Sequence, residues 1–151
     1  MQEISSVIPG ILYISSYEPA ARRENLKELE ILHVVRLGDD DDFMHYYITH
    51  DDVHYHDVLI EDDMDVDLTT EMLDEATEFI HFAHSPVLVH CFAGVSRSSS
   101  IVIAYLMRFT KMTFSFASDC LTRKHPRAQP NPKFLKDLIK YEHQLILKRN
   151  I

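Results

Sequence analysis

Short apolar runs alternate along the chain with longer amphipathic segments. Runs with the length and composition of β-strands lie at residues 11–14, 31–37, 46–48, 54–60 and 87–89. The last of them, Val87-Leu88-Val89, is apolar throughout. Such a run is typical of a central strand that is covered on both faces.

The amphipathic segments predict helices. They lie at residues 19–29, from Thr69 or Thr70 (as N-cap) to about residue 83, and at residues 98–108, 114–124 and 133–148. Residues 125–132 contain three prolines and are expected to form a loop. Strands that alternate with helices predict an α/β fold with a central sheet and packed helices.

Length and charge narrow the classes of function. A chain of 151 residues is expected to form a single domain, residues 1–151. The formal net charge of −9 argues against broad binding to nucleic acid or to an anionic membrane surface. Much of the acid lies at residues 39–42 and 51–67. We interpret the first patch as a solvated surface, and an acidic rim that favours substrates with basic flanks is the alternative.

The cysteines and the termini bear on location. Two cysteines, Cys91 and Cys120, do not make a disulfide framework. No secretory signal, membrane-spanning run or lipidation motif is visible in the sequence. We therefore expect a soluble protein of the cytoplasm or nucleus, where free thiols stay reduced. The sequence does not indicate an oligomeric state.

The segment after the apolar run at 87–89 carries the chemistry. Cys91 is followed by Phe92, Ala93, Gly94, Val95 and Ser96, and then by Arg97, Ser98 and an apolar helix. A tight loop between a buried strand and a helix N-terminus predicts a phosphate-binding cradle of backbone N–H groups. Cys91 would be a reactive thiolate at its base, and the planar fork of Arg97 would grip phosphate oxygens. Ser98 can donate a hydrogen bond to the sulfur.

These residues resemble a known family. His90-Cys91, five further residues and Arg97-Ser98 match the signature loop of the protein tyrosine phosphatase superfamily, and the version from Ala93 to Ser98 resembles the dual-specificity phosphatases. The resemblance implies a central mixed, largely parallel sheet flanked by helices. It also implies a cysteinyl-phosphate intermediate, no metal or other cofactor, phosphoprotein substrates, and an orienting hydrogen bond from His90.

Two positions depart from the pattern of that family, and they bear on substrate preference. Arg36 stands where asparagine is common, and His125 stands where an arginine usually precedes the proline.

The family also implies a general acid in the loop before the second long helix. Three aspartates of residues 61–67 are candidates, and alignment on Leu68-Thr69 favours Asp62 over Asp63, with Asp65 third. Ten histidines do not form a firm metal-ligand pattern, and Cys120 is expected in the core.

Three functions remain open, and the leading one is hydrolysis of phosphotyrosine, phosphoserine and phosphothreonine in proteins. One alternative is a phosphoinositide or RNA 5′-phosphatase, which would usually carry basic residues within the loop. The other is a phosphopeptide-binding pseudophosphatase, which would typically lack the cysteine or the arginine.

Overall fold

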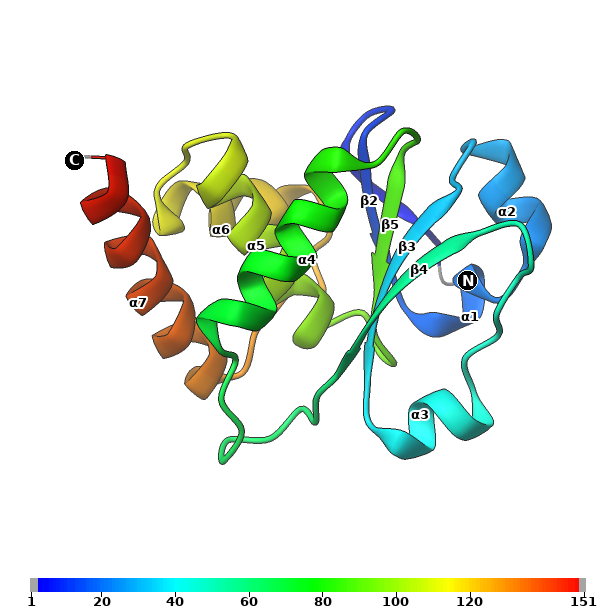
Figure 1. Cartoon of the computed structure of the whole chain (residues 1–151), viewed down its shortest axis with the longest axis horizontal. Helices are drawn as coiled ribbons and strands as arrows, with labels where there is room; N and C mark the ends of the chain where they lie inside the picture. The colour runs from blue at the N-terminus through cyan, green and yellow to red at the C-terminus, as the bar shows by residue number, and fades with distance from the viewer. Residues whose placement is uncertain (1–2, 150–151) are drawn as a thin grey trace.

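A five-stranded sheet runs through the centre of the molecule in the computed structural model, which describes residues 3–149 (Figure 1). The strand order is β1-β2-β5-β3-β4. The strands are β1 (Ser5–Ile8), β2 (Leu12–Ser15), β3 (His33–Gly38), β4 (His54–Leu59) and β5 (Val87–His90). Only the pair β1 and β2 is antiparallel, and the other three pairs are parallel. The prediction of a mixed, largely parallel sheet is confirmed.

Helices cover both faces of this sheet. They are α1 (Tyr17–Ala20), α2 (Arg23–Glu28), α3 (Asp40–His45), α4 (Thr70–Phe82), α5 (Arg97–Phe109), α6 (Phe114–Lys124) and α7 (Pro132–Arg149). Figure 1 shows α4 to α7 on one side of the sheet, α1 and α2 on the other, and α3 at the lower edge. No helix within residues 3–149 has the length and apolarity needed to cross a bilayer.

The strand predicted to be central, β5, lies between β2 and β3. Val87, Leu88 and Val89 are at most 1% exposed. The larger apolar cluster, which includes Val87 and Val89, joins this strand to α4, α5, α6 and α7, and a smaller cluster around Leu88 includes Leu26 of α2. Burial on both faces explains why this run has no polar position.

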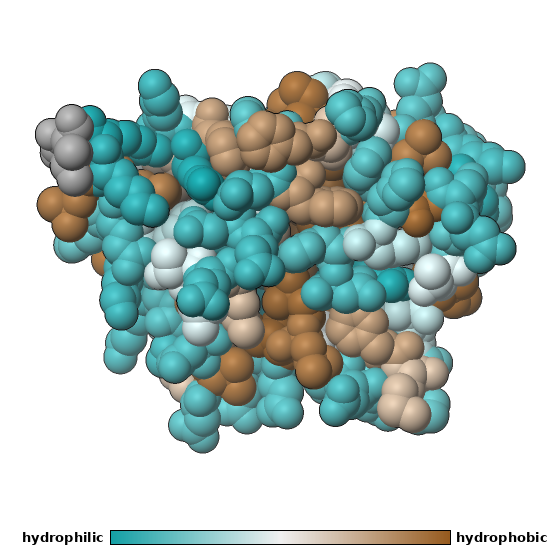
Figure 2. Space-filling view, in the orientation of Figure 1, coloured by the Kyte–Doolittle hydropathy of each residue, from teal (hydrophilic) through white to brown (hydrophobic). Residues whose placement is uncertain are grey.

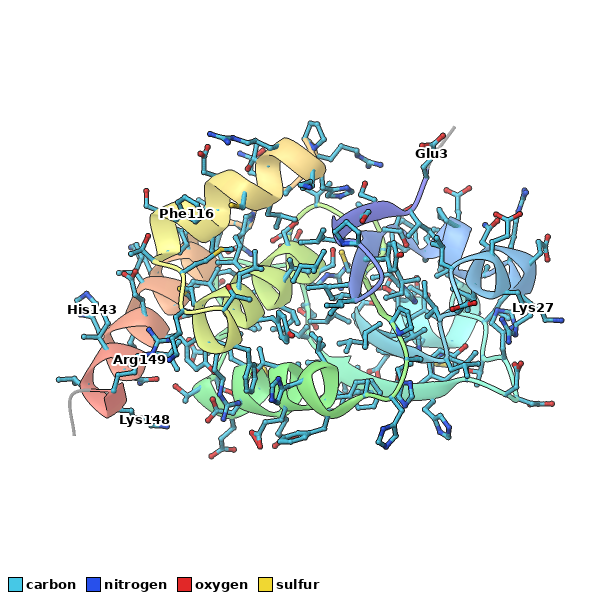
Figure 3. All side chains as sticks on the ribbon, turned by 90° about the horizontal axis from the view of Figure 1, so that it is seen from above. Glu3, Lys27, Phe116, His143, Lys148 and Arg149 are labelled. Atoms are coloured by element: carbon cyan, nitrogen blue, oxygen red, sulfur yellow. The ribbon has the colours of Figure 1, made fainter. Side chains whose placement is uncertain are left out.

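The surface is more polar than the core. The face drawn in Figure 2 is largely hydrophilic, with separate apolar areas between the polar side chains. Phe116 on the outer side of α6 is one large apolar side chain left exposed, at 58% (Figure 3).

Two of the predicted elements are wrong. The single helix expected at residues 19–29 is broken, because Arg22 has an extended backbone and the Asn25 side chain donates to the Pro19 carbonyl. The strand expected at residues 46–48 does not form. Tyr46 ends α3, and the Tyr47 hydroxyl donates to the Leu37 carbonyl at 2.7 Å, so its aromatic ring packs without strand pairing.

Candidate active site

The predicted phosphate loop, residues 91–96, connects the end of β5 to the start of α5. It therefore lies at the carboxyl edge of the parallel strands, where open α/β sheets bind ligands. Figure 1 shows α3, which follows β3, and the chain after β4 at this same lower edge. Three segments far apart in sequence thus meet at this edge of the sheet.

Most carbonyl groups of the loop are held by donors from the surrounding structure. The pairs are Cys91 O with His90 Nδ1 (3.2 Å), Phe92 O with Tyr17 N (3.2 Å), Gly94 O with His125 Nε2 (2.6 Å), Val95 O with Gln129 N (2.8 Å) and Ser96 O with Ser100 N (3.0 Å). Across a planar trans peptide bond, the C=O of one residue and the N–H of the next point in opposite directions, so fixing the carbonyls from outside leaves N–H groups for an anion inside.

Gly94 is the position in this loop that requires glycine. Its φ is +71°, and a Cβ atom there would lie 2.8 Å from the backbone N of Ser16. Other residues rarely adopt that φ, and the Ser16 backbone cannot move aside cheaply. The close approach of β2 and the loop therefore depends on this one residue.

Cys91 is 2% exposed, and donors converge on its sulfur. The Gly94 N–H donates to Sγ at 3.3 Å, and the Ser98 hydroxyl lies 3.1 Å from it. Because Ser98 lies in the first turn of α5, the sulfur also lies near the N-terminus of that helix. Such donors and the helix dipole stabilise negative charge on sulfur.

Arg97 is 8% exposed and is held by two acceptors. Its Nη1 donates to Asp42 Oδ2 and to the Ile60 carbonyl, both at 3.0 Å. Burial opposes the charge of Arg97, but the Cys91, Tyr47 and Asp42 side chains outweigh burial and raise its pKa. The expectation that residues 39–42 are a solvated patch is wrong for Asp42, which is 7% exposed because α3 turns it towards Arg97.

Among the candidate acids, Asp62 is the one that the structure ties to the phosphate loop. Its Oδ1 accepts a hydrogen bond from Asn131 Nδ2 at 2.9 Å, and Asn131 N donates to Ser96 Oγ at 2.9 Å. Asp63 instead accepts from the backbone N of Asp65, within its own turn. The Asp62 side chain is exposed, as a group that exchanges protons with substrate and water must be.

His90 is buried below the loop at 3% exposure. Burial lowers its pKa to about 4, so the ring is neutral at pH 7 and its Nδ1–H donates to Cys91 O. It also meets the Tyr47 ring edge-on, at 4.8 Å between centroids. This geometry suits an orienting group better than a base.

The sequence alone does not indicate a role in the site for three residues that the structure places there: Asp42, His125 and Asn131. His125 links Gly94 O to Ser5 Oγ, which is 2.8 Å from its Nδ1, and burial lowers its pKa. Asn131 accepts from Phe134 N at 2.8 Å and so caps α7. Asparagine before Pro132, the first residue of the helix, is a cap signal that the sequence contains.

The other reactive or ligating side chains lie apart from this site. Cys120 on α6 is a free thiol and only partly buried, so the expected core position is correct only in part. Within residues 3–149, no three histidine, cysteine, aspartate or glutamate side chains gather as metal ligands.

Known proteins resemble this chain throughout. The family described as "Dual specificity phosphatase, catalytic domain" matches residues 12–144. Human dual specificity protein phosphatase 9 is 34% identical over 94% of this chain and 37% of its own length. Dual specificity protein phosphatase 1B of Arabidopsis thaliana is 33% identical over 95% of this chain and 84% of its own length. The chain spans only 16%, 36% and 37% of the first three curated relatives.

Solved structures agree in fold. Human DUSP28 superposes with a TM-score of 0.82 at 28% identity, covering 95% of both chains. A mouse putative dual specificity phosphatase, in complex with zinc tungstate, superposes with a TM-score of 0.84 at 26% identity, covering 97% of this chain and 90% of its own. The chain belongs to the dual specificity phosphatase family, and residues 12–144 form the phosphatase catalytic domain of that family.

Proposed function

We propose that residues 1–151 form one catalytic unit that hydrolyses phosphotyrosine, phosphoserine and phosphothreonine in proteins through a cysteinyl phosphate on Cys91. The observation that carries this proposal is the convergence of the Gly94 N–H and the Ser98 hydroxyl on Cys91 Sγ, at 3.3 and 3.1 Å. A nucleophilic sulfur at the base of an anion cradle suits in-line attack on a bound phosphate.

In the first step, the Cys91 thiolate attacks phosphorus and an S–P bond forms while the ester P–O bond breaks. Asp62 gives its proton to the leaving oxygen, which departs as the free hydroxyl of the substrate side chain. The N–H groups of the loop and Arg97 hold the equatorial oxygens, on which the charge of the transition state lies.

In the second step, a water molecule attacks phosphorus and the Asp62 carboxylate accepts its proton. The S–P bond breaks, inorganic phosphate leaves, and Cys91 returns to the thiolate. The Ser98 hydroxyl is placed to donate to that sulfur as its charge returns. No metal or organic cofactor takes part in this sequence of steps.

Protein substrates fit the surroundings of the loop better than polyanionic ones. Residues 92–96 contain no lysine or arginine, and the segments beside the loop are rich in aspartate. A phosphoinositide or an RNA 5′-phosphate carries further negative charge and would be repelled there. One relative is named a MAP kinase phosphatase, so phosphorylated kinase segments are a natural first class of substrate.

Turnover of phosphorylated peptides and of p-nitrophenyl phosphate tests the proposal. The wild-type chain should release inorganic phosphate, and Cys91→Ser should abolish release because a hydroxyl is a far weaker nucleophile here. Cys120→Ser is the matched control, since the other cysteine lies on α6, and it should retain activity.

Three results would contradict the proposal: no turnover by the wild type, equal loss in both variants, or turnover of phosphoinositide or RNA 5′-phosphate alone. The peptide panel should include tyrosine, serine and threonine phosphates with acidic and basic flanks.

A further inference from the structure

Arg97 meets a buried carboxylate that the proposed mechanism does not use. Asp42 Oδ2 lies 3.0 Å from Arg97 Nη1, and both side chains are only 9% exposed. We propose that Asp42 is a positioning residue that fixes the Arg97 guanidinium so that its Nε–Nη2 edge faces the phosphate. The inference rests on the proposed function, in which Arg97 binds the phosphate.

The hydrogen-bond pattern of Arg97 carries this inference. Both hydrogen bonds that its guanidinium makes within residues 3–149 use Nη1, one to Asp42 Oδ2 and one to Ile60 O. The Nε–Nη2 edge is thereby left for a ligand. Two parallel N–H groups on that edge match two oxygens of a phosphate.

Arg36 is an arginine of the same molecule that binds an anion with its Nε–Nη2 edge. Its Nε and Nη2 bind the two oxygens of Asp57 at 2.7 and 2.8 Å, while its Nη1 donates to Thr49 at 2.8 Å. Arg36 therefore holds an anion with the edge that Arg97 keeps free. The two arginines differ in that the anion of Arg97 would be the substrate.

Asp42 is itself held rigidly. It is the third residue of α3, and it forms a reciprocal capping box with Asp39. Asp39 N donates to Asp42 Oδ2 at 3.0 Å, and Asp42 N donates to Asp39 Oδ1 at 2.9 Å. A Cβ atom on Gly38 would lie 2.9 Å from Asp42 Cβ, so glycine at the end of β3 lets the helix start this close. A fixed carboxylate can fix the arginine that it binds.

Asp42 could instead act as a latch that competes with phosphate for Arg97. The two roles predict opposite results when the carboxylate is removed. If Asp42 positions Arg97, removing its carboxylate weakens oxyanion binding. If Asp42 is a latch, removing its carboxylate strengthens oxyanion binding. The free edge of Arg97 favours positioning, because the phosphate and Asp42 would use different nitrogens.

The test uses the tungstate anion, whose binding by calorimetry does not require turnover. Asp42→Ala should weaken tungstate binding about tenfold and raise KM for p-nitrophenyl phosphate more than it lowers kcat, as expected for a loosened charged hydrogen bond. Asp42→Asn retains an oxygen acceptor for Nη1 and should restore most of the affinity. Asp39→Ala is the matched control, because it removes the carboxylate that caps α3 but keeps the backbone N–H of Asp39 that donates to Asp42 Oδ2.

Thermal melting should show a loss of stability in both variants, larger in Asp42→Ala because it leaves Arg97 buried without its partner, with wild-type tungstate affinity only in Asp39→Ala. If Asp42→Ala does not fold, Asp42→Ser replaces it, since its hydroxyl stops one bond short of the Oδ2 position. Unchanged or tighter tungstate binding, or an equal loss in Asp39→Ala, would overturn the inference. Tungstate binding with no turnover of any phosphate ester would instead refute the proposed function.

Discussion

Single residues decide which way the backbone of the phosphate loop faces. Gly94 permits the close approach of the loop to the end of β2. The His125 side chain, which lies outside the loop, binds the carbonyl of the same glycine. Cys91 and Arg97 could be recognised from their own spacing, since one short loop contains both. Asp42 could not, because it lies 55 residues from Arg97 and reaches it only through the fold. The sequence therefore predicts the nucleophile and the clamp, and the family resemblance implies His90 as an orienting group, but neither indicates Asp42.

Asp62 is the residue whose role is most open to a direct test. Asp62→Asn keeps the shape of the side chain and an oxygen acceptor for Asn131, but it cannot donate a proton as a carboxylic acid does. We expect kcat to fall about 10²- to 10³-fold with little change in KM, the range typical of a lost general acid. The loss should be smaller for substrates with a good leaving group, which need less protonation.

Asp63→Asn provides the comparison, because Asp63 bonds within its own turn. Rates with p-nitrophenyl phosphate and with phosphoserine peptides measure both variants. A large loss in Asp63→Asn with normal rates in Asp62→Asn would move the acid to the neighbouring residue.

At the scale of elements, periodicity predicted the long helices and the buried strands well, since each follows one hydrophobic rule over many residues. It failed where tertiary contacts decide. The segment at residues 46–48 has strand-forming residues, yet the Tyr47 hydroxyl is used to bind β3 from a loop. The strand β1 was not predicted, because its four residues include two serines and show no clear pattern. Short elements depend on partners that a local pattern does not contain.

The start of α7 joins helix stability to catalysis through Asn131. Asn131→Ala removes the cap of α7 and also the hydrogen bond to Asp62 Oδ1, so both stability and kcat should fall. Thr69→Ala is the matched control, because Thr69 caps α4 through Met72 N at 3.2 Å. Each variant should lose about 1 kcal/mol in urea unfolding, as lost caps usually do.

Only Asn131→Ala should also lower kcat, by about tenfold, since a misplaced proton donor slows the chemical step. Equal kcat values for the two variants would show that Asn131 serves the helix alone.

At the scale of the whole molecule, the site sits where the most deeply buried elements meet. The central strand β5 ends at His90, and α5, buried along most of its length, begins at Arg97. Side chains from distant segments reach the loop and Arg97, such as His125 at Gly94 O and Asp42 at Arg97 Nη1, so the geometry of the site depends on global folding. Conditions that weaken the fold should therefore weaken the site as well, and buried histidines make low pH such a condition.

His90 couples folding to pH. Burial lowers its pKa from the ordinary 6.5 to about 4, so the unfolded chain binds a proton between these values that the folded chain does not. Stability is therefore full above pH 6.5 and falls as the pH drops to about 4, by about 3 kcal/mol from this residue. The pKa values of His125 and His33 are also lowered by burial, and they add to the fall in the same direction.

Urea unfolding at a series of pH values between 7 and 4 measures this effect. His90→Asn removes the titrating group and keeps a side-chain N–H for Cys91 O, so its unfolding free energy should depend less on pH than that of the wild type. His143 is exposed on α7 (Figure 3), so His143→Asn should keep the wild-type dependence. Two results would contradict this prediction: an unfolding free energy of the wild type that does not change from pH 7 to pH 4, or the same pH dependence in His90→Asn and in the wild type. Either would mean that His90 has the same pKa in the folded and the unfolded chain.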